Sequence, residues 1–325
     1  MALRFIYSQL FTTLPSPSSS YTNQTVIVTG SNVGLGLEAA RHYTRLGAAT
    51  VVLAVRSLEK GEAAKRDIES STGRKDVVRV MQLDMSSYQS VLDFASTASK
   101  TLPRIDIAIL NAGVARGEWE VFEQDEATIT VNVVSTFLLA FSLLPKLKST
   151  AQAYNTRPTL TITASEVHEW ASFEERHAPE GQIFARLNEK EINGKPADLA
   201  ERYQVSKLLE VLAVREMCEL HPAPTFPVTL NCVNPGLCHS ELSREAGWGL
   251  WLMKLLLART TEAGSRTLVH AGSSGQESHG QYLSDAKIVP PSVFVRSEEG
   301  KKTQKRVWDE LIAKLEGIKK GVTKV

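Results

Sequence analysis

A tyrosine and a lysine four residues apart, Tyr203 and Lys207, have the spacing in this chain that most directly suggests chemistry. Residues at this spacing lie on the same face of a helix, about one turn apart. A free tyrosine has a pKa of about 10 and therefore exchanges its proton poorly at neutral pH. A neighbouring ammonium group stabilises the phenolate and lowers that pKa. Tyr203 is therefore a candidate proton donor and acceptor.

A glycine-rich segment far upstream offers a place for a nucleotide. Gly30, Gly34 and Gly36 directly follow an expected strand and open an expected helix. Glycines there permit a tight turn and close approach of the backbone to phosphate, and the helix N-terminus adds free N–H groups. The spacing is not the commoner G-x-G-x-x-G, so an ordinary turn remains an alternative. We also expect cofactor contacts from the intervening residues Asn32, Val33 and Leu35.

The elements that must position these residues alternate regularly along the chain. Continuous apolar strands separated by helices predict an α/β fold, a doubly wound parallel sheet of the Rossmann type, with ligands at the carboxyl ends of the strands. We expect strands over 25–29, 50–55, 77–83, 105–110, 159–164, 227–233 and 280–284. We expect helices near 34–46, 59–71, 87–100, 125–148, 198–220 and 260–272.

The chain is interpreted as a single domain with additions. The predicted division is an N-terminal arm (1–23), a Rossmann-type domain (24–285) and a C-terminal extension (286–325). Within the domain, a polar segment rich in Glu, Gly and Pro (166–200) predicts an inserted lobe, and an apolar segment (237–258) predicts a substrate loop. In the extension, an apolar stripe predicts a packed helix; it consists of Val307, Trp308, Leu311, Ile312 and Leu315.

Composition narrows the range of partners. With 325 residues, 42% of them apolar, and a net charge of +1, the chain can bury a large core and gives no indication of a nucleic-acid partner. The cysteines Cys218, Cys232 and Cys238 lack metal-ligand spacing, so we expect no metal site and a reducing, cytoplasmic location. No stretch reaches the roughly 18 apolar residues of a membrane span, although residues 1–11 leave a peripheral membrane contact open. A homo-oligomer is also open.

Residues at the ends of the next strands indicate which cofactor is used. Arg56 follows the second expected strand, where an acidic residue would normally bind the ribose 2′-hydroxyl. Its planar guanidinium can instead pair with a 2′-phosphate, which favours NADP(H); an exposed surface arginine is the alternative. Asp84, with Met85 beside it, is placed to contact the adenine after the third strand. A close backbone approach, or a simple turn, is expected at Asn111, Ala112 and Gly113.

Taken in order, these motifs resemble the short-chain dehydrogenase/reductase superfamily over about residues 24–285. The matching positions are Thr29-Gly30 through Gly36, Asp84, Asn111-Ala112-Gly113, Asn132, Ser165, Tyr203 with Lys207, and Asn234-Pro235-Gly236. Further details resemble the retinol-dehydrogenase-like branch and fungal members of secondary metabolism. Among these details are Val55-Arg56-Ser57-Leu58 and Ser165 followed by His168.

The resemblance implies a role for each catalytic residue. Tyr203 would be the general acid in carbonyl reduction and the base in the reverse reaction, while Lys207 would lower its pKa and hold the nicotinamide ribose. Ser165 would donate a hydrogen bond to the substrate oxygen. Asn132 would hold a water in a proton relay behind Lys207. The residues implied to lie near the nicotinamide and phosphates are Pro235, Gly236, Leu237 and Ser240.

One departure from the family pattern concerns the path between two catalytic residues. Ser165 and Tyr203 are 38 residues apart, much farther than is usual in the superfamily, so the inserted lobe must loop out without disturbing them. His168, Glu169 and Trp170 follow the catalytic serine closely enough to contact a substrate, although solvated or packing roles are more common.

The expected function is that of an NADPH-dependent oxidoreductase. It would transfer a hydride between nicotinamide and the carbonyl or alcohol of a hydrophobic substrate, with a polyketide-like compound as one candidate. One alternative uses the same site for epimerisation, dehydration or isomerisation without net redox change. Another is a nucleotide-binding sensor with little turnover, against which the complete proton-transfer set argues.

Overall fold

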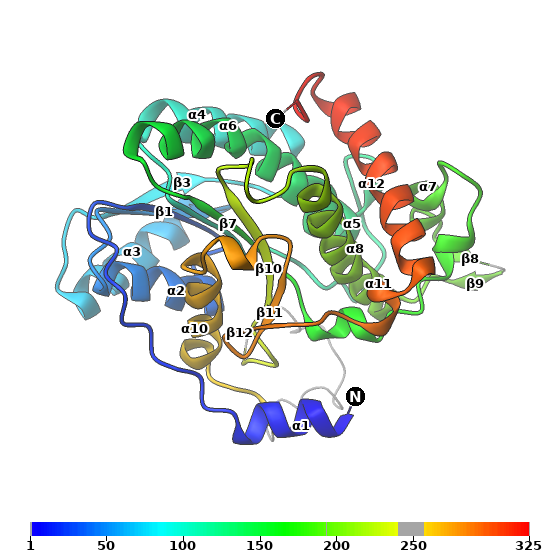
Figure 1. Cartoon of the computed structure of the whole chain (residues 1–325), viewed down its shortest axis with the longest axis horizontal. Coiled ribbons are helices and arrows are strands. Elements are labelled where there is room, and N and C mark those ends of the chain that lie inside the picture. The colour runs from blue at the N-terminus through cyan, green and yellow to red at the C-terminus, as the bar shows by residue number, and fades with distance from the viewer. Residues whose placement is uncertain (1, 193, 240–256, 325) are drawn as a thin grey trace.

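The computed structural model describes residues 2–192, 194–239 and 257–324. Its centre is an eight-stranded sheet in the order β12-β11-β10-β7-β4-β1-β2-β3 (Figure 1). All neighbouring pairs are parallel except the pair of β11 with β12. The strands are β1 (Thr25–Thr29), β2 (Thr50–Val55), β3 (Val78–Gln82), β4 (Ile107–Leu110), β7 (Thr159–Thr163), β10 (Thr229–Asn234), β11 (Tyr282–Ser284) and β12 (Lys287–Val289).

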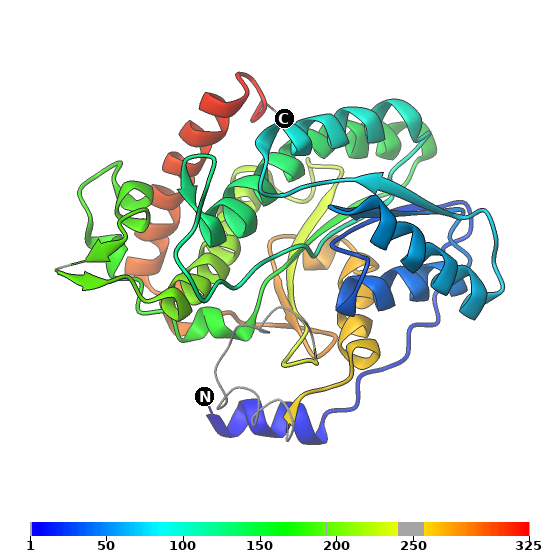
Figure 2. The same ribbon diagram turned by 180° about the vertical axis from the view of Figure 1, so that it is seen from behind.

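Helices cover both faces of this sheet because its strands are apolar on both sides (Figures 1 and 2). Successive strand residues point to opposite faces. In β1, Val26 and Val28 pack in one core with α2 (Gly34–Arg45), α3 (Leu58–Thr72) and α10 (Thr261–Gly272). Ile27 packs in the other core with α4 (Tyr88–Thr101), α6 (Thr136–Tyr154) and α8 (Leu199–Leu220). The predicted doubly wound α/β fold is confirmed.

The sheet continues one strand beyond the last one expected from the sequence. Asp285 and Ala286 have φ values of 52° and 56°, which fit the two central positions of a tight hairpin turn. The turn reverses the chain, so β12 pairs antiparallel with β11 at the sheet edge. The C-terminal extension therefore begins with a strand of the central sheet.

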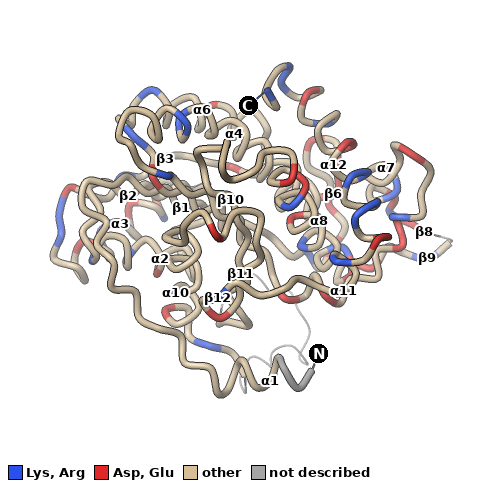
Figure 3. The backbone as a smooth tube through the Cα atoms, viewed as in Figure 1, with Lys and Arg blue, Asp and Glu red and all other residues tan. Residues whose placement is uncertain are grey.

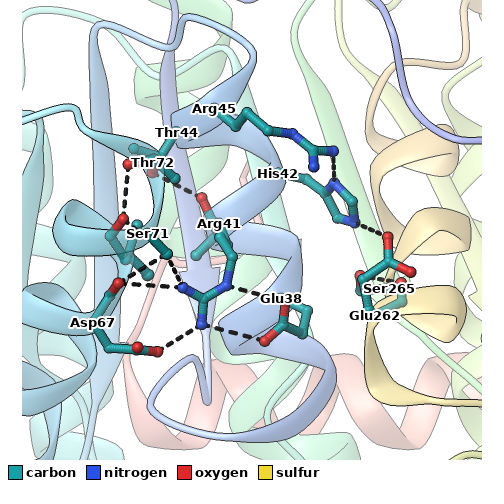
Figure 4. Close-up of polar contacts among 12 residues, drawn as sticks. Glu38, Arg41, His42, Thr44, Arg45, Asp67, Ser71, Thr72, Glu262 and Ser265 are labelled. Atoms are coloured by element: carbon teal, nitrogen blue, oxygen red, sulfur yellow. Dashed lines mark hydrogen bonds and ion pairs between the residues drawn. The ribbon is translucent and has the colours of Figure 1, made fainter.

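The helix that follows the glycine loop is tied to its neighbours by polar side chains (Figure 4). Arg41 of α2 pairs with Asp67 of α3 at 2.6 Å and with Glu38 of its own helix at 3.1 Å. His42 is buried, which lowers its pKa and keeps the ring neutral. Its Nδ1 accepts from Arg45 at 2.7 Å, and its Nε2 faces Glu262 of α10 at 3.1 Å. These contacts fix the orientation of α2 more than they add stability, since exposed ion pairs contribute about 0–1 kcal/mol.

The inserted lobe packs against both α8 and the C-terminal helix α12 (Glu298–Ile318), which also contact each other directly. A buried ion pair of 2.7 Å joins Arg202 of α8 to Glu175 of the lobe. Glu310 of α12 accepts hydrogen bonds from two lobe N–H groups, those of Ile183 and Phe184. Basic and acidic residues both occur in the region of α7, α8 and α12 (Figure 3). The lobe contains η2 (Glu166–Glu169), η3 (Glu174–His177), α7 (Ile183–Leu187), β8 (Glu191–Ile192) and β9 (Lys195–Pro196).

The remaining elements lie between the main helices and strands or flank the sheet. The apolar stripe expected in the extension is the buried face of α12; Val307, Trp308, Leu311 and Leu315 are all buried. Further elements are β5 (Val121–Phe122), β6 (Asp125–Glu126), α5 (Ala127–Ile129), the π-helical η1 (Thr130–Ser135), η5 (Gln276–Ser278) and α11 (Val293–Arg296).

The N-terminal helix α1 (Ala2–Phe11) lies apart from the sheet and contacts residues that flank the substrate loop (Figure 1). Gln9 Nε2 donates to the carbonyl oxygens of Leu237 and Leu257 at 2.9 and 3.3 Å. Arg259 donates to the Ser8 carbonyl at 2.6 Å and pairs with Asp285 at 2.8 Å. The arm is therefore held against both ends of that loop.

One helical stretch is more apolar than the sequence analysis allowed. The continuous helix of residues 127–154 is long and apolar enough to cross a membrane, contrary to the expectation that no segment would qualify. However, 94% of its most apolar window is buried inside the molecule. This helix packs in the hydrophobic core on one face of the sheet, and that burial explains its apolar sequence.

Candidate active site

The glycine loop and the Tyr–Lys pair line one cavity of about 1130 Å³. The cavity lies at the carboxyl ends of β1, β4, β7 and β10, where a doubly wound sheet binds ligands. Most of the residues predicted for the site line it: Gly30, Asn32, Val33, Gly34, Leu35, Asn111, Ala112, Gly113, Ser165, Tyr203, Lys207, Pro235, Gly236 and Leu237. Ser240 and most of the predicted substrate loop, 237–258, lie outside the described residues.

The glycine loop has the backbone shape that a phosphate-binding turn requires. Gly30 and Gly34 have φ values of 63° and 62°, a region that residues with a side chain rarely adopt. A Cβ on Gly36 would lie 2.6 Å from the Gly30 carbonyl oxygen, so only glycine fits there. Val33 precedes α2 without capping it by its side chain, which leaves the first N–H groups of the helix available to an anion. These residues fit a bound dinucleotide.

Hydrogen bonds hold the neighbouring strand ends in place beneath the cofactor position. The Thr29 hydroxyl accepts from the N–H groups of Asn111 and Ala112 at 2.9 and 2.8 Å. The Asn111 amide donates back to the Thr29 carbonyl at 3.0 Å. A Cβ on Gly113 would lie 3.2 Å from Asn132 Oδ1, so the chain passes close to this side chain. Residues 111–113 are thus held in place by hydrogen bonds to Thr29, and they line the cavity.

Arg56, Asp84 and Met85 do not line this cavity, but they follow β2 and β3 at the same edge of the sheet. Arg56 is exposed, as a ligand for a 2′-phosphate must be. The Asp84 carboxylate accepts from the N–H and hydroxyl of Ser86 at 2.9 and 2.7 Å, so it also shapes its own turn. Their predicted cofactor contacts stay predictions.

Tyr203 and Lys207 lie on α8, which begins after its N-cap Asp198. The Asp198 carboxylate accepts from the N–H groups of Ala200 and Glu201 at 2.9 and 3.2 Å, and this cap fixes where the helix starts. Lys207 Nζ lies 5.8 Å from the centre of the Tyr203 ring. It donates to the Thr163 carbonyl at the end of β7, at 2.8 Å.

Ser165 and Tyr203 line the same cavity although the lobe separates them in sequence. Ser165 lies two residues after the end of β7, and the interaction of its side chain with Tyr203 lowers the pKa of the phenol. His168 stands behind it: its ring Nδ1 lies 2.7 Å from the Ser165 carbonyl, and its Nε2 accepts from the N–H of Ser292 at 3.1 Å. Burial lowers the pKa of His168 to about 4, so the ring is neutral and Nδ1 donates. His168 therefore packs behind the serine and does not contact the cavity.

The net shift of the Tyr203 pKa is opposite to the one expected from the sequence. Burial raises the pKa of the Tyr203 phenol, and the Lys207 charge and the Ser165 hydrogen bond lower it. The Glu210 carboxylate raises it again, so the pKa remains above its ordinary value. Lys207 acts in the predicted direction, but desolvation of the phenolate outweighs it.

Among the described residues, the hydrogen bonds of the Asn132 side chain go to Val114 and Ser206 and not to Lys207. Asn132 lies in the π-helical segment η1, a distortion often found at functional sites. Its Oδ1 accepts from the Val114 N–H at 2.9 Å, and its Nδ2 donates to the Val114 carbonyl at 3.0 Å and to Ser206 Oγ at 2.9 Å. The side chain thus ties the loop after β4 to α8. Its predicted role in holding a water stays a prediction.

Some residues at the site were not found from the sequence. Phe5 of α1 and Trp119 line the cavity, and Trp170, which the sequence analysis had considered, lies there too. The rings of Phe5 and Trp170 meet edge to face at 6.2 Å. Glu210 pairs with Lys207 at 2.8 Å. Its spacing of three from Lys207 was a usable signal, whereas nothing local marks Phe5.

Comparison with known proteins agrees with this geometry. The model of the short chain dehydrogenase family matches residues 24–154. The short chain dehydrogenase/reductase dmxR8 of Cryptosporiopsis sp. (strain 8999) is 58% identical over 321 residues, covering 98% of each chain. The short chain dehydrogenase atnD of Emericella nidulans is 45% identical over 290 residues, covering 87% of this chain and 90% of that protein.

Solved structures share the fold at low identity. A protein from Mycobacterium paratuberculosis superposes with a TM-score of 0.67 at 23% identity, covering 93% of this chain and 95% of its own. A short chain dehydrogenase from Shigella flexneri 2a, solved in complex with NADP, gives 0.60 at 22% identity, covering 83% and 100%.

The fold and the site together define an oxidoreductase of the doubly wound, nucleotide-binding class. The chain belongs to the short-chain dehydrogenase/reductase family, whose members use nicotinamide cofactors. The predicted superfamily and its resemblance to fungal members are confirmed. Assignment to the retinol-dehydrogenase-like branch stays a prediction.

Proposed function

We propose that this protein is an NADPH-dependent reductase, or alcohol dehydrogenase in the reverse direction, acting on a hydrophobic carbonyl compound. One observation carries the proposal: the glycine loop and the side chains of Ser165, Tyr203 and Lys207 line the same cavity. A nucleotide held by that loop and a substrate held by those hydroxyls would therefore be in contact.

The residues of the chain divide the work as follows. Gly30 to Gly36 and the N-terminus of α2 hold the phosphates, and Lys207 holds the nicotinamide ribose. NADP(H), when bound, supplies or accepts the hydride at C4 of its nicotinamide ring. Ser165 donates a hydrogen bond to the substrate oxygen, an interaction whose loss costs about 3 kcal/mol at comparable sites.

Proton transfer at the same oxygen is the work of Tyr203. In reduction its hydroxyl gives a proton to the developing alkoxide, and in oxidation the phenolate takes it back. A positioned acid or base contributes on the order of 10²–10⁴-fold. Burial raises the pKa of Tyr203, but the charge of Lys207 and the nearby Ser165 side chain both lower it and so support this role.

The choice of NADP(H) rests on Arg56. Its exposed guanidinium follows β2, next to the strand that leads into the glycine loop. A 2′-phosphate there would gain a charge-assisted, bidentate partner. A ribose 2′-hydroxyl would meet no carboxylate at this position.

The substrate class rests on the cavity wall. Phe5, Trp119 and Trp170 present aromatic surface from three separate segments, and Val114 and Leu199 add aliphatic surface. Aromatic walls suit large, flat apolar ligands, which stack or pack edge to face against them. A polyketide-like ketone or phenol-bearing ring system has that shape.

The proposal keeps two assignments made from the sequence. The catalytic residues are Asn132, Ser165, Tyr203 and Lys207.

The chain is divided into an N-terminal arm, a Rossmann-type domain that carries the inserted lobe, and a C-terminal extension. NADPH consumption should depend on added bulky aromatic ketones, with alcohol products identified by mass. Product formed without net change in NADPH would contradict the redox assignment, and NADPH binding without turnover across a broad carbonyl panel would contradict catalysis altogether.

A further inference from the structure

Glu210 belongs to the same stripe of α8 as the two proposed catalytic side chains. Tyr203, Lys207 and Glu210 are spaced i, i+4 and i+7, which places them on one face of the helix. Tyr203 and Lys207 line the cavity, whereas Glu210 does not and lies deeper, 2% exposed. The stripe therefore runs from the reacting hydroxyl into the protein interior.

The Lys207 ammonium is held from two sides. Its Nζ donates to Glu210 Oε1 and to the Thr163 carbonyl, both at 2.8 Å. Burial alone would favour the neutral amine, but the charge of Glu210, and that of Tyr203 once it ionises, offset this and keep the pKa of Lys207 above its ordinary value. These two acceptors fix the position of the Lys207 ammonium relative to the Tyr203 ring.

Glu210 itself depends on this lysine. Oε1 accepts from Lys207, and within the described residues no protein group donates a hydrogen bond to Oε2. A buried carboxylate with a single partner is costly unless it has a function or its charge is adjusted. Consistent with this, burial raises the pKa of Glu210 to about 7, against the opposing effect of Lys207.

We propose that Glu210 is a positioning residue for Lys207: it anchors Nζ and, through its own negative charge, sets how readily Tyr203 releases its proton. The inference rests on the proposed function, because it gives Tyr203 the acid–base role. An ionised Glu210 cancels part of the lysine charge that Tyr203 experiences. Tyr203 is then kept protonated, as the donor in carbonyl reduction must be.

The ionisable groups around Glu210 are few. On its own helix they are Lys207 and Tyr203, and on β10 the Cys232 thiol faces it. Burial raises the pKa of Cys232, and the Glu210 charge adds to that effect, so this thiol stays neutral at working pH. Within the described structure, the lysine–tyrosine pair is therefore what the Glu210 charge acts on.

The test is the Glu210→Gln variant, which keeps the shape and removes the charge. Ultraviolet difference titration of the cofactor-free protein, each curve corrected by the same protein carrying Tyr203→Phe, isolates the ionisation of Tyr203. The Thr163 carbonyl and the Tyr203 phenolate itself still favour the charged Lys207 in this variant, and no carboxylate then opposes the lysine charge. We therefore expect the Tyr203 transition to move about one pH unit lower. The pH profile of alcohol oxidation should move down by the same amount. Superimposable curves would overturn the proposal.

Two further variants separate the effect of the Glu210 charge from the effect of the shape of its side chain. Glu210→Asp keeps a carboxylate and should return the titration toward wild type; a curve coinciding with that of Glu210→Gln would contradict the proposal. Glu219→Gln removes an exposed carboxylate from the same helix and should leave the curve unchanged. If the Gln variant does not fold, Glu210→Asn against Glu210→Asp gives the same comparison.

Failure of this inference is distinguishable from failure of the proposed function. If Tyr203→Phe retains turnover, the acid role itself is wrong whatever Glu210 does. If Tyr203→Phe is inactive while the Glu210→Gln titration is unshifted, only the role of Glu210 is wrong.

Discussion

The side chains of Ser165 and Tyr203 line the same cavity, and Ser165 lowers the pKa of the Tyr203 phenol, although 38 residues separate them in the chain. The lobe between them is anchored elsewhere, by Arg202–Glu175 at α8 and by Glu310 at α12. The lobe therefore leaves Ser165 and Tyr203 in the same cavity and adds Trp170 to its wall.

The proposed preference for NADP(H) rests on the guanidinium of Arg56. Arg56→Ala should weaken NADPH binding by about 10- to 100-fold, because a hydrogen-bonded charge contributes about 1.5–3 kcal/mol. NADH binding should change little, since it has no 2′-phosphate. Dissociation constants from fluorescence titration check both, with the exposed Arg66→Ala on α3 as control. An equal loss for both cofactors would refute the assignment.

The N-terminal helix should contribute to substrate binding and not to cofactor binding. Phe5→Ala removes an aromatic ring from the cavity and should raise KM for a bulky ketone about 10-fold, the effect of about 1.5 kcal/mol of apolar burial. The value of kcat and the NADPH dissociation constant should stay near wild type. Tyr7→Ala, on the exposed side of α1, is the matched control. An unchanged KM in Phe5→Ala would remove α1 from the site.

A feature of this site can be predicted from the sequence when residues close together in the chain determine it, and not when contacts across the fold do. The strands, their parallel doubly wound arrangement and the glycine loop could be predicted, because apolar runs and glycines at fixed spacing are local signals. The place of Phe5 could not, because it depends on Gln9 reaching the carbonyls of Leu237 and Leu257 across the fold. The raised pKa of Tyr203 also depends on burial, which residue spacing does not report.

His168 should make stability depend on pH. Its folded pKa of about 4 lies below the unfolded value of about 6.5, so its contribution is complete above pH 6.5 and is lost as pH falls toward 4. Up to about 3 kcal/mol of unfolding free energy is involved, at 1.36 kcal/mol per pKa unit.

Urea unfolding near pH 7 and near pH 4.5 measures this dependence. His168→Gln should be less stable at neutral pH, because the bonds to Ser165 and Ser292 are disturbed, but it should lose less stability on acidification than wild type. Other buried histidines such as His42 and His279 contribute equally to both proteins and cancel. Parallel losses in the two proteins would show that His168 is not the titrating group.

The central claim is that Tyr203 transfers the proton at the substrate oxygen. Its most direct test is the rate of NADPH consumption by Tyr203→Phe with a bulky hydrophobic ketone that the wild-type protein reduces, measured together with NADPH binding. We expect binding close to wild type and a kcat lower by about 10²–10⁴-fold. A Tyr203→Phe protein that binds NADPH and turns over at the wild-type rate would contradict the account.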